Sequence, residues 1–356
     1  MRMTSFVLCL LLLGGCSGLP YPREMGDMAL LRVMGVDWTP EGLQVTVSTG
    51  RRAEHAQSGQ RDALTLSALR PSLSGAVLEI QGKAGDFIFF GYVDQLLLGE
   101  ELARQGIIPV LDYFARDVEL GLGARLWMSR QGTAAAAVES GDGQGIDRRL
   151  ETLQADGEMG IAVISRTAGE VYSDLLERGS AYIPALELPS QEGEALHQSG
   201  YAVLKANDLM GYLDGEQARG LELLEGRPMA DVVELTLAGG ERAVVKVTGA
   251  VTLCRLRPEG AGLSLLCRVE GAVVECDRRL TAQEREWVEA ALGERELTRI
   301  KGTLELLRLW QTDCVGLGMR AGVTAPREWS RVEGEWPVQF SKQEPEVIVK
   351  VELHQI

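Results

Sequence analysis

The spacing of apolar residues along this chain predicts β-strands in several places. Leu43, Val45 and Val47 alternate with polar residues after a turn at 39–42, and this two-residue period is typical of a half-buried strand. Residues 29–50 are therefore expected to form a β-hairpin. Alternation, or a short apolar run rich in β-branched residues, also predicts strands at 87–98, 120–128, 182–188, 201–205, 209–213, 243–256, 263–275 and 347–353.

Helices are predicted where apolar residues recur every three or four positions. The segment 297–307 follows this spacing. It belongs to a long helix that opens with Thr281 and Glu284, the pattern of a capping box. Residues 64–80 are also expected to be helical, with a kink or a split at Pro71. Other helices are expected at 100–114 in two pieces, 134–138, 148–178 with a break near 157–160, 215–224 and 326–332. The tryptophans expected to pack in the core are Trp287, Trp310, Trp329 and Trp336.

The order of these elements predicts the fold class and the domains. Strands and helices are mixed without a regular strand–helix–strand rhythm, which favours an α+β fold with mixed, mainly antiparallel sheets flanked by helices. The chain has 356 residues, enough for two domains at roughly 150 residues each. Proline, glycine and glutamate concentrate at 189–195. We therefore place a boundary there, between an N-terminal domain at 24–190 and a C-terminal domain at 196–356.

The first residues are typical of a lipoprotein signal peptide. A positively charged start precedes an apolar run at 6–13, which would span about 12 Å as a helix, too short to cross a bilayer. The run ends in LGGC at 13–16, which resembles the bacterial lipobox. In that signal the cysteine receives a diacylglyceryl group and the peptide before it is removed. We expect residues 1–15 to be the signal peptide, Cys16 to carry the lipid and residues 16–23 to form a spacer.

The charge of the chain restricts how it can meet membranes and nucleic acids. It has 36 Lys and Arg against 51 Asp and Glu, a net charge of −15. Such a polyanion repels phosphate backbones and anionic headgroups, which argues against nucleic-acid binding and against attachment through a basic patch. Membrane attachment is therefore expected through the lipid on Cys16, because two acyl chains suffice for stable anchoring.

Four cysteines remain after Cys16, and their state is not fixed by the sequence. An extracytoplasmic location permits disulfides. Cys254 and Cys267 flank a turn, but the alternation of apolar residues directs them to opposite faces, so a bridge between them would need a bulge. Buried free thiols are the preferred expectation and the bridge stays open. The four are Cys254, Cys267, Cys276 and Cys314.

No pattern in the chain predicts catalysis, a metal site or a cofactor. The nucleophile-elbow, zinc-protease and P-loop motifs are absent. Gly316, Gly318 and Ala321 match the spacing of a dinucleotide-binding loop, but they follow a helix instead of a strand. The glycine-rich loop at 139–147 lacks the spacing of a calcium-binding EF-hand. No local metal motif links the three histidines, which are His55, His197 and His354.

Several short segments, taken in order, resemble one family. After the lipobox, the chain resembles the Ger(x)C family, the lipoprotein C subunits of nutrient germinant receptors in endospore-forming bacteria. The closest segment is 200–226, which begins GYAVLKANDLMGYL. Departures from the family pattern are Leu204, where the family usually has Phe, Pro71 in the first predicted helix, and the four additional cysteines. The segments that carry the resemblance are 23–37, 92–117, 179–186, 200–226 and 336–353.

The resemblance implies a function that composition and spacing do not. It implies a non-enzymatic, lipid-anchored subunit of a spore germinant receptor, placed on the outer face of the spore inner membrane beside two integral-membrane subunits and required for nutrient-triggered germination. It leaves open a division into three domains in space. The turn at 207–211 either shapes a bend or presents a partner surface. The alternatives are an extracytoplasmic solute-binding lipoprotein of a transporter and, third, an anchored hydrolase.

Overall fold

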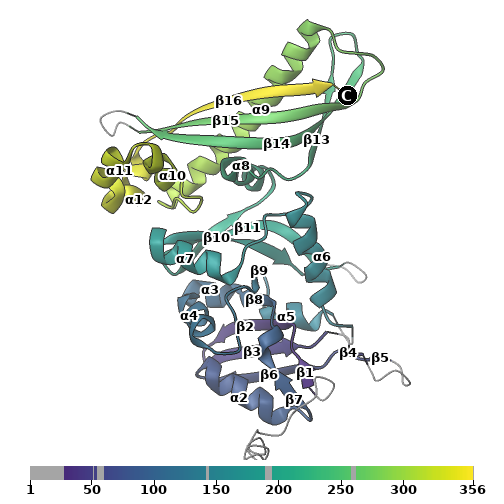
Figure 1. The fold of residues 1–356 in the computed structure, drawn as a ribbon, viewed down its shortest axis with the longest axis vertical. Helices are drawn as coiled ribbons and strands as arrows, with labels where there is room; N and C mark the ends of the chain where they lie inside the picture. Colours follow the sequence, from purple (N-terminus) through teal and green to yellow (C-terminus); the bar gives the residue numbers. More distant parts are fainter. Residues whose placement is uncertain are drawn as a thin grey trace, which may run out of the picture.

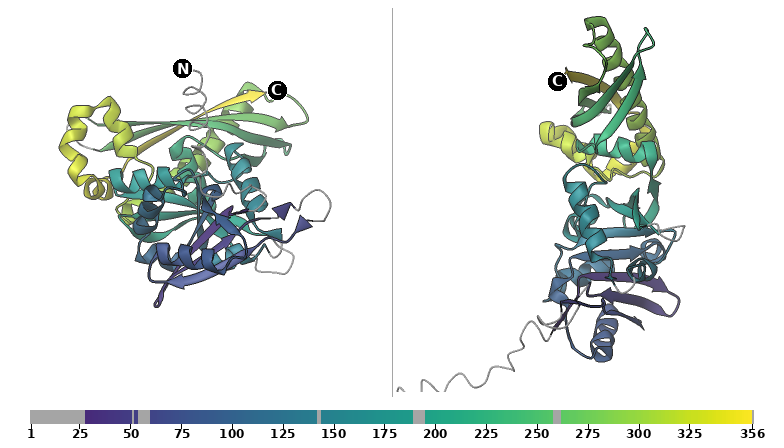
Figure 2. Two further views of the ribbon diagram at one scale, coloured as in Figure 1. Left: turned by 60° about the horizontal axis from the view of Figure 1, so that its bottom comes forward. Right: turned by 90° about the vertical axis from the view of Figure 1, so that its right-hand side faces the viewer.

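The computed structural model of the protein describes residues 28–50, 52–53, 60–141, 144–188, 195–257 and 262–355. The molecule is elongated and carries one sheet toward each end of its long axis (Figures 1 and 2). The elements up to residue 187 are β1 (Met28–Leu30), β2 (Val33–Thr39), β3 (Gly42–Ser48), β4 (Arg52–Ala53), β5 (Gln60–Arg61), β6 (Thr65–Arg70), α2 (Leu73–Lys83), β7 (Phe87–Phe89), η2 (Phe90–Tyr92), β8 (Gln95–Gly99), α3 (Glu100–Gln105), α4 (Ile108–Arg116), β9 (Arg125–Arg130), α5 (Ala134–Glu139), α6 (Asp147–Glu158), α7 (Ala168–Arg178) and β10 (Ser180–Glu187). The later elements are β11 (His197–Lys205), β12 (Asp208–Leu213), α8 (Gly215–Glu225), β13 (Asp231–Thr236), β14 (Arg242–Leu256), β15 (Leu263–Glu275), α9 (Ala282–Leu309), α10 (Leu317–Thr324), α11 (Pro326–Val332), η5 (Glu333–Glu335), α12 (Trp336–Lys342) and β16 (Glu346–Gln355).

The larger sheet has eight strands in the order β12-β11-β10-β9-β8-β2-β3-β6. Its central strands β2, β8, β9 and β10 are parallel to one another, whereas the strands on either side pair antiparallel. The parallel centre is built by crossovers through α3 and α4 and through α5 to α7, because parallel neighbours need such connections. The predicted α+β fold with mixed sheets is confirmed.

The predicted hairpin at 29–50 is present as β2 and β3. Val36 pairs with Val45 and Thr39 with Gly42 at the turn. Val45 and Val47 are fully buried, as the alternation predicts. β1 lies outside this hairpin and pairs instead with β7, in parallel.

The region predicted as one helix at 64–80 is a strand followed by a helix. β6 ends at Arg70, and α2 begins only at Leu73. Pro71 separates them, because the residue before a proline favours an extended backbone. Ser72 then accepts a hydrogen bond from the amide of Gly75 and caps α2. The helix prediction was wrong for 64–70, where pairing with β3 supplies backbone partners.

Two smaller predictions also need correction. The strand expected at 120–128 is β9, which begins at Arg125, because residues 121–124 form a turn that contains Gly121 and Gly123. Trp287 was expected in the core but is 47% exposed. It precedes Val288, which lies on the buried stripe of α9. One residue turns a helix by about 100°, so Trp287 faces solvent.

The smaller sheet has four strands in the order β13-β14-β15-β16. Only β15 and β16 are parallel among these strands. α9 crosses one face of this sheet (Figure 1), and Leu292 and Ile300 on it are fully buried. The predicted capping box of α9 is present, because Thr281 and Glu284 each bond the other's backbone amide.

The two halves are joined through the larger sheet. β11 and β12 follow the predicted boundary at 189–195, yet β11 pairs with β10 across it. Residues 189–194 lie outside the described part of the chain. The division into 24–190 and 196–356 stays a prediction, and by hydrogen bonding the larger sheet extends to Leu213.

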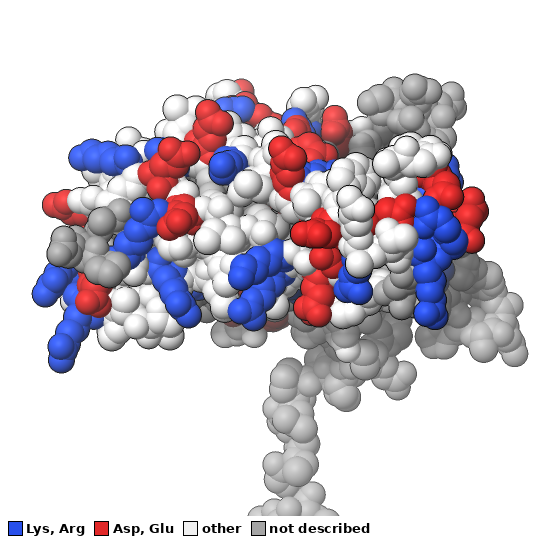
Figure 3. Space-filling model, turned by 90° about the horizontal axis from the view of Figure 1, so that it is seen from above, with Lys and Arg blue, Asp and Glu red and all other residues white. Residues whose placement is uncertain are grey.

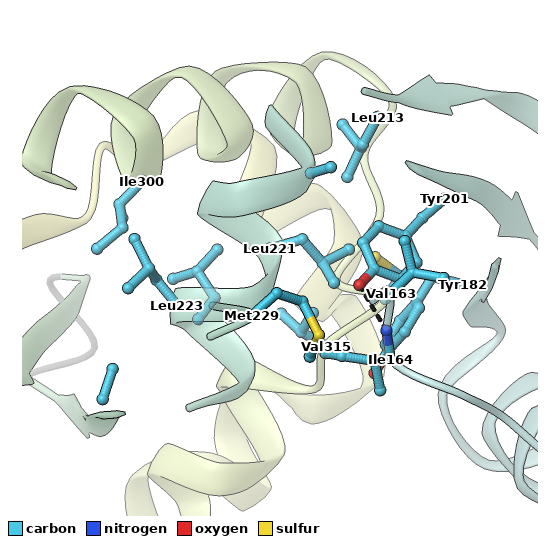
Figure 4. Packing of buried hydrophobic residues seen from close by; sticks show 14 of the residues in the cluster. Val163, Ile164, Tyr182, Tyr201, Leu213, Leu221, Leu223, Met229, Ile300 and Val315 are labelled. Atoms are coloured by element: carbon cyan, nitrogen blue, oxygen red, sulfur yellow. Dashed lines mark hydrogen bonds between the residues drawn. The ribbon is translucent and has the colours of Figure 1, made fainter. Parts of the chain in front are cut away.

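One buried hydrophobic cluster runs from the larger sheet into the smaller one. It includes Tyr182, Leu213, Leu221 on α8 and Ile300 on α9, and Figure 4 shows these side chains converging from both halves. A second cluster lies on the other face of the larger sheet, beneath α2, α4 and α7. The two halves therefore share one core.

The four cysteines beyond the N-terminal segment are free thiols. Cys254 pairs with Leu265, and Cys267 with Thr252, so the expectation that the two cysteines point to opposite faces was wrong, and both lie on the buried face. They are offset by two positions along the hairpin and form no bridge. Burial raises the pKa of Cys254 to about 11. Cys314 is also buried, while Cys276 is half-buried. Among the described residues, no helix is both long and apolar enough to cross a bilayer.

Candidate functional site at the junction of the two sheets

The turn between β11 and β12 lies in the segment that most resembles the family, and it is held by packing. The Asn207 side-chain oxygen accepts a hydrogen bond from the amide of Ile108, at 2.8 Å. Gly106 has a φ of +113°, and a Cβ there would overlap the Asn207 amide. Glycine is needed at position 106 because of this positive φ and because a side chain would clash with Asn207. Asn207 thus fixes β11 and β12 to the start of α4.

The same turn also touches the C-terminal half. The Lys205 ammonium donates to the backbone oxygen of Trp310, at 3.2 Å. A Cβ on Gly211 would lie 2.8 Å from the ring of Trp310, so the ring packs directly on the strand backbone. These contacts favour the interpretation of 207–211 as a structural bend that connects the two halves.

A buried polar group crosses the junction beside this turn. The Tyr201 hydroxyl donates to the Glu222 carboxylate, at 3.0 Å. It also accepts from the amide of Ile164, at 2.8 Å, as Figure 4 shows. Glu222 also accepts from Arg219 and from the amide of Met229. Burial raises the pKa of Tyr201 and of Glu222, so the carboxylate is ionised at some cost. The network links β11, α8 and the loop before α7.

A charged cavity of about 580 Å³ opens at the junction. Arg166 is 8% exposed, lies 4.5 Å above the Tyr182 ring and donates to Asp174, at 2.5 Å. Burial lowers the pKa of Arg166, but Tyr182 and Asp174 raise it by more. Arg178 pairs with Asp174 as well. Both arginines are thus paired with residues that line the same cavity. We therefore interpret the cluster as a structural contact between α7 and β10.

The carboxylate of Glu225 completes this cavity from the side of α8. Burial raises the pKa of Glu225, although Arg166 and Arg320 oppose that rise. Arg320 on α10 donates to the backbone oxygens of Leu224 and Thr252, at 2.6 and 2.7 Å. α10 is therefore tied both to the end of α8 and to β14.

An apolar cavity of about 220 Å³ lies next to the charged one. Trp336 forms part of its wall, and its indole N–H donates to Asp313, at 2.8 Å. Asp313 also accepts the amides of Leu317 and Gly318 at the start of α10. A Cβ on Gly318 would overlap the Trp336 ring. Gly318 is therefore needed for the close packing of Trp336. The amides at the start of α10, which would bind the phosphates in a dinucleotide-binding loop, already donate to Asp313.

The residues singled out from sequence are not brought together here. Cys16 and His55 lie outside the described residues. His197 and His354 are exposed on β11 and β16. Among the residues that the structure describes, no three His, Cys, Asp or Glu side chains are placed to hold a metal ion.

Sequence reasoning missed the polar groups of the junction. Tyr182 and Tyr201 stand in apolar strands, and Glu222 stands in an apolar turn of α8. A polar residue within such a run is a usable signal, because buried polar groups need partners. Their partners are distant in sequence, so the signal alone does not identify them.

Comparisons with known proteins agree for both halves of the chain. The family model described as spore germination protein N-terminal domain matches residues 22–188, and that described as spore germination B3/GerAC like, C-terminal, matches residues 199–356. A protein of Bacillus subtilis (strain 168) named for spore germination, YfkR, is 24% identical over 277 residues, which cover 73% of this chain and 70% of that protein. The crystal structure of the GerBC protein aligns with a TM-score of 0.57 and 16% identity, over 90% of this chain and 96% of that chain. At 16% identity, the similarity to the GerBC structure shows a shared fold and nothing beyond it.

Proposed function

Because the chain belongs to the GerAC-like family of spore germination proteins, we propose that it is the lipid-anchored, non-enzymatic subunit of a germinant receptor. In this role it is required when nutrients trigger spore germination. It acts beside two integral-membrane subunits, on the outer face of the spore inner membrane. The observation that carries the proposal is the match of both family models, in order, over both halves of the chain.

The anchor in this proposal is the lipid on Cys16. The LGGC sequence at 13–16 follows an apolar run of signal-peptide length. Two acyl chains on one cysteine give stable attachment, which an acidic protein of charge −15 would not obtain from its own surface. Residues 1–15 are the proposed signal peptide, and 16–23 the proposed spacer.

A solute-binding lipoprotein of a transporter is not favoured. Such a protein closes two lobes around a ligand by a hinge. Here Tyr182, Leu213, Leu221 and Ile300 form one cluster that fills the junction, so closure would have to break a packed core. The GerAC-like family assignment points the same way.

The proposal is tested by deleting the locus in the native spore former. Nutrient germination is expected to fall strongly, while germination by calcium dipicolinate, which bypasses the receptor, is expected to continue. A complementing copy should restore the response, and a copy with Cys16→Ala should restore it poorly and leave the membrane fraction. Unchanged nutrient germination in a strain without a second copy of the gene would refute the proposed role.

A further inference from the structure

One face of the four-stranded sheet is covered and the other is open. α9 packs on the covered face, toward which Thr252 and Cys267 point and where both are buried. Side chains alternate across a strand, so the residues between them point the other way. Val251, Leu253 and Ile348 are 57%, 41% and 45% exposed. Large apolar side chains thus lie on a face that is open to solvent.

The strand register places the apolar side chains of this open face in a row. Leu253 on β14 pairs with Leu266 on β15, and Leu266 pairs with Ile348 on β16. Directly opposite residues have Cβ atoms about 5 Å apart, so the three form one continuous apolar strip across three strands. Such a strip can supply the apolar part of an interaction surface whose remainder is polar.

A row of positive charge borders the strip. Arg268 lies directly opposite Lys350, both are exposed, and neither makes an ion pair with another described residue. The next row on this face, away from the strip, is Glu270 opposite Glu352, likewise exposed and without an ion pair among the described residues. Like charges directly opposite destabilise a sheet. Within each row the like charges repel, whereas the two rows attract each other, so the face presents a fixed pattern of positive and negative charge that a partner of complementary pattern would match.

We propose that this open face docks a partner protein whose surface carries an apolar strip, then carboxylates, then Lys or Arg side chains in register with it. The proposal rests on the proposed function, because the occupant is an extracytoplasmic part of an integral-membrane receptor subunit. The apolar strip supplies buried area, and the two charged rows fix orientation and select the partner.

A protein fits this face better than a membrane does. The acidic row beside the basic row repels anionic headgroups. The sheet also lies at the end of the molecule opposite β1, where the described chain begins (Figures 1 and 2). Seen from above, this end carries Lys and Arg beside Asp and Glu, with uncharged areas between them (Figure 3). Mixed charge of this kind suits another protein surface.

A second copy of the chain fits less well than a different protein. A two-fold axis between the charged rows would set the basic row of each copy against the acidic row of the other. It would also set the apolar strip against the row beyond the glutamates. That row contains the exposed Lys246 and His354, so the strip would face polar side chains.

The test uses the full-length, lipidated chain, tagged and purified from spore membranes with the two integral-membrane receptor subunits, each quantified by immunoblot. Two variants change the face: Ile348→Glu, and Arg268→Glu with Lys350→Glu. Each is expected to lower the recovered subunits about tenfold or more, as reversed or unpaired interface charges do. Matched controls on α9 are Leu309→Glu, at a residue 74% exposed, and Lys301→Glu, also exposed. Both controls are expected to retain the subunits.

A third variant separates docking from folding. Arg268→Gln with Lys350→Gln removes the two positive charges without reversing them, so the purified chain is expected to keep its melting temperature while recovering less of the subunits. A changed melting temperature with wild-type recovery would make the rows purely structural and overturn the proposal. So would wild-type recovery in both Glu variants.

Two further outcomes bear on the occupant. Loss of binding to phosphatidylglycerol vesicles in the non-lipidated Arg268→Glu, Lys350→Glu chain, compared with the non-lipidated parent, would assign the face to lipid and overturn the protein partner. Failure of the unmodified chain to recover either membrane subunit would overturn the receptor role, and this proposal with it. The two failures are therefore distinguishable.

Discussion

At the scale of single residues, the junction depends on polar side chains that have no alternative partner. Tyr201 satisfies both the carboxylate of Glu222 and the amide of Ile164, and it is fully buried. A buried polar atom left without a partner costs about 1–3 kcal/mol. The hydroxyl of Tyr201 is therefore expected to contribute more to the free energy of unfolding than a hydrogen bond on the surface does.

Tyr201→Phe tests this argument. The free energy of unfolding is expected to fall by about 1–3 kcal/mol at pH 7, measured by urea denaturation. The bond from Tyr201 opposes the rise in the pKa of Glu222 that burial causes. A carboxylate with a raised pKa destabilises the fold when it is ionised, so the deficit should shrink as the pH falls through the raised pKa of Glu222 toward the ordinary value of 4.5. Tyr92→Phe, at a residue 45% exposed, is the control. Equal effects of the two changes would contradict the argument.

At the scale of elements, the predictions that were confirmed rested on residues that interact with close neighbours in the sequence. Thr281 and Glu284 lie within one helical turn, so the capping box of α9 was readable. The partners of Tyr201 lie 21 and 37 residues away, and nothing local indicates them. β6 shows the same limit, because Thr65–Arg70 becomes a strand through its pairing with β3. The apolar pattern predicted most elements, and long-range pairing decided the rest.

The start of α9 gives a prediction with a defined pH window. The Arg278 guanidinium, with help from the backbone of Thr281, lowers the pKa of Glu284 to about 2. A lowered pKa stabilises the fold above the ordinary value of 4.5, and this contribution is lost as the pH falls toward 2. Glu284→Gln should therefore lower the melting temperature at pH 7, with a difference that vanishes near pH 2.

Melting curves of the full chain between pH 7 and pH 2 measure this difference. Glu286→Gln is a matched control on the same helix turn, since Glu286 is exposed and makes no ion pair with a described residue. A difference between the Glu284→Gln chain and the wild type that is constant with pH would show that the carboxylate charge is not involved.

At the scale of the whole molecule, the shared core makes one cooperative unit of two sheets. Leu221 on α8 is fully buried between them. Unfolding followed by far-UV circular dichroism and by tryptophan fluorescence is expected to give coincident midpoints in urea. Leu221→Ala should lower the free energy of unfolding by about 2–5 kcal/mol and shift both probes together. Leu309→Ala, at an exposed position, should shift neither, and separate transitions for the two probes would contradict a shared core.

The pairing of β10 with β11 has a consequence for how the chain is made. The strands of the larger sheet continue to Leu213, past the segment where the N-terminal family model ends. A chain that emerges from the ribosome and the translocon N-terminus first cannot close this sheet until residue 213 is outside. Until then β10 presents an open edge, and an unpaired edge is prone to aggregate. Truncation near 190 would make that open edge of β10 permanent, so a chain cut there is expected to aggregate.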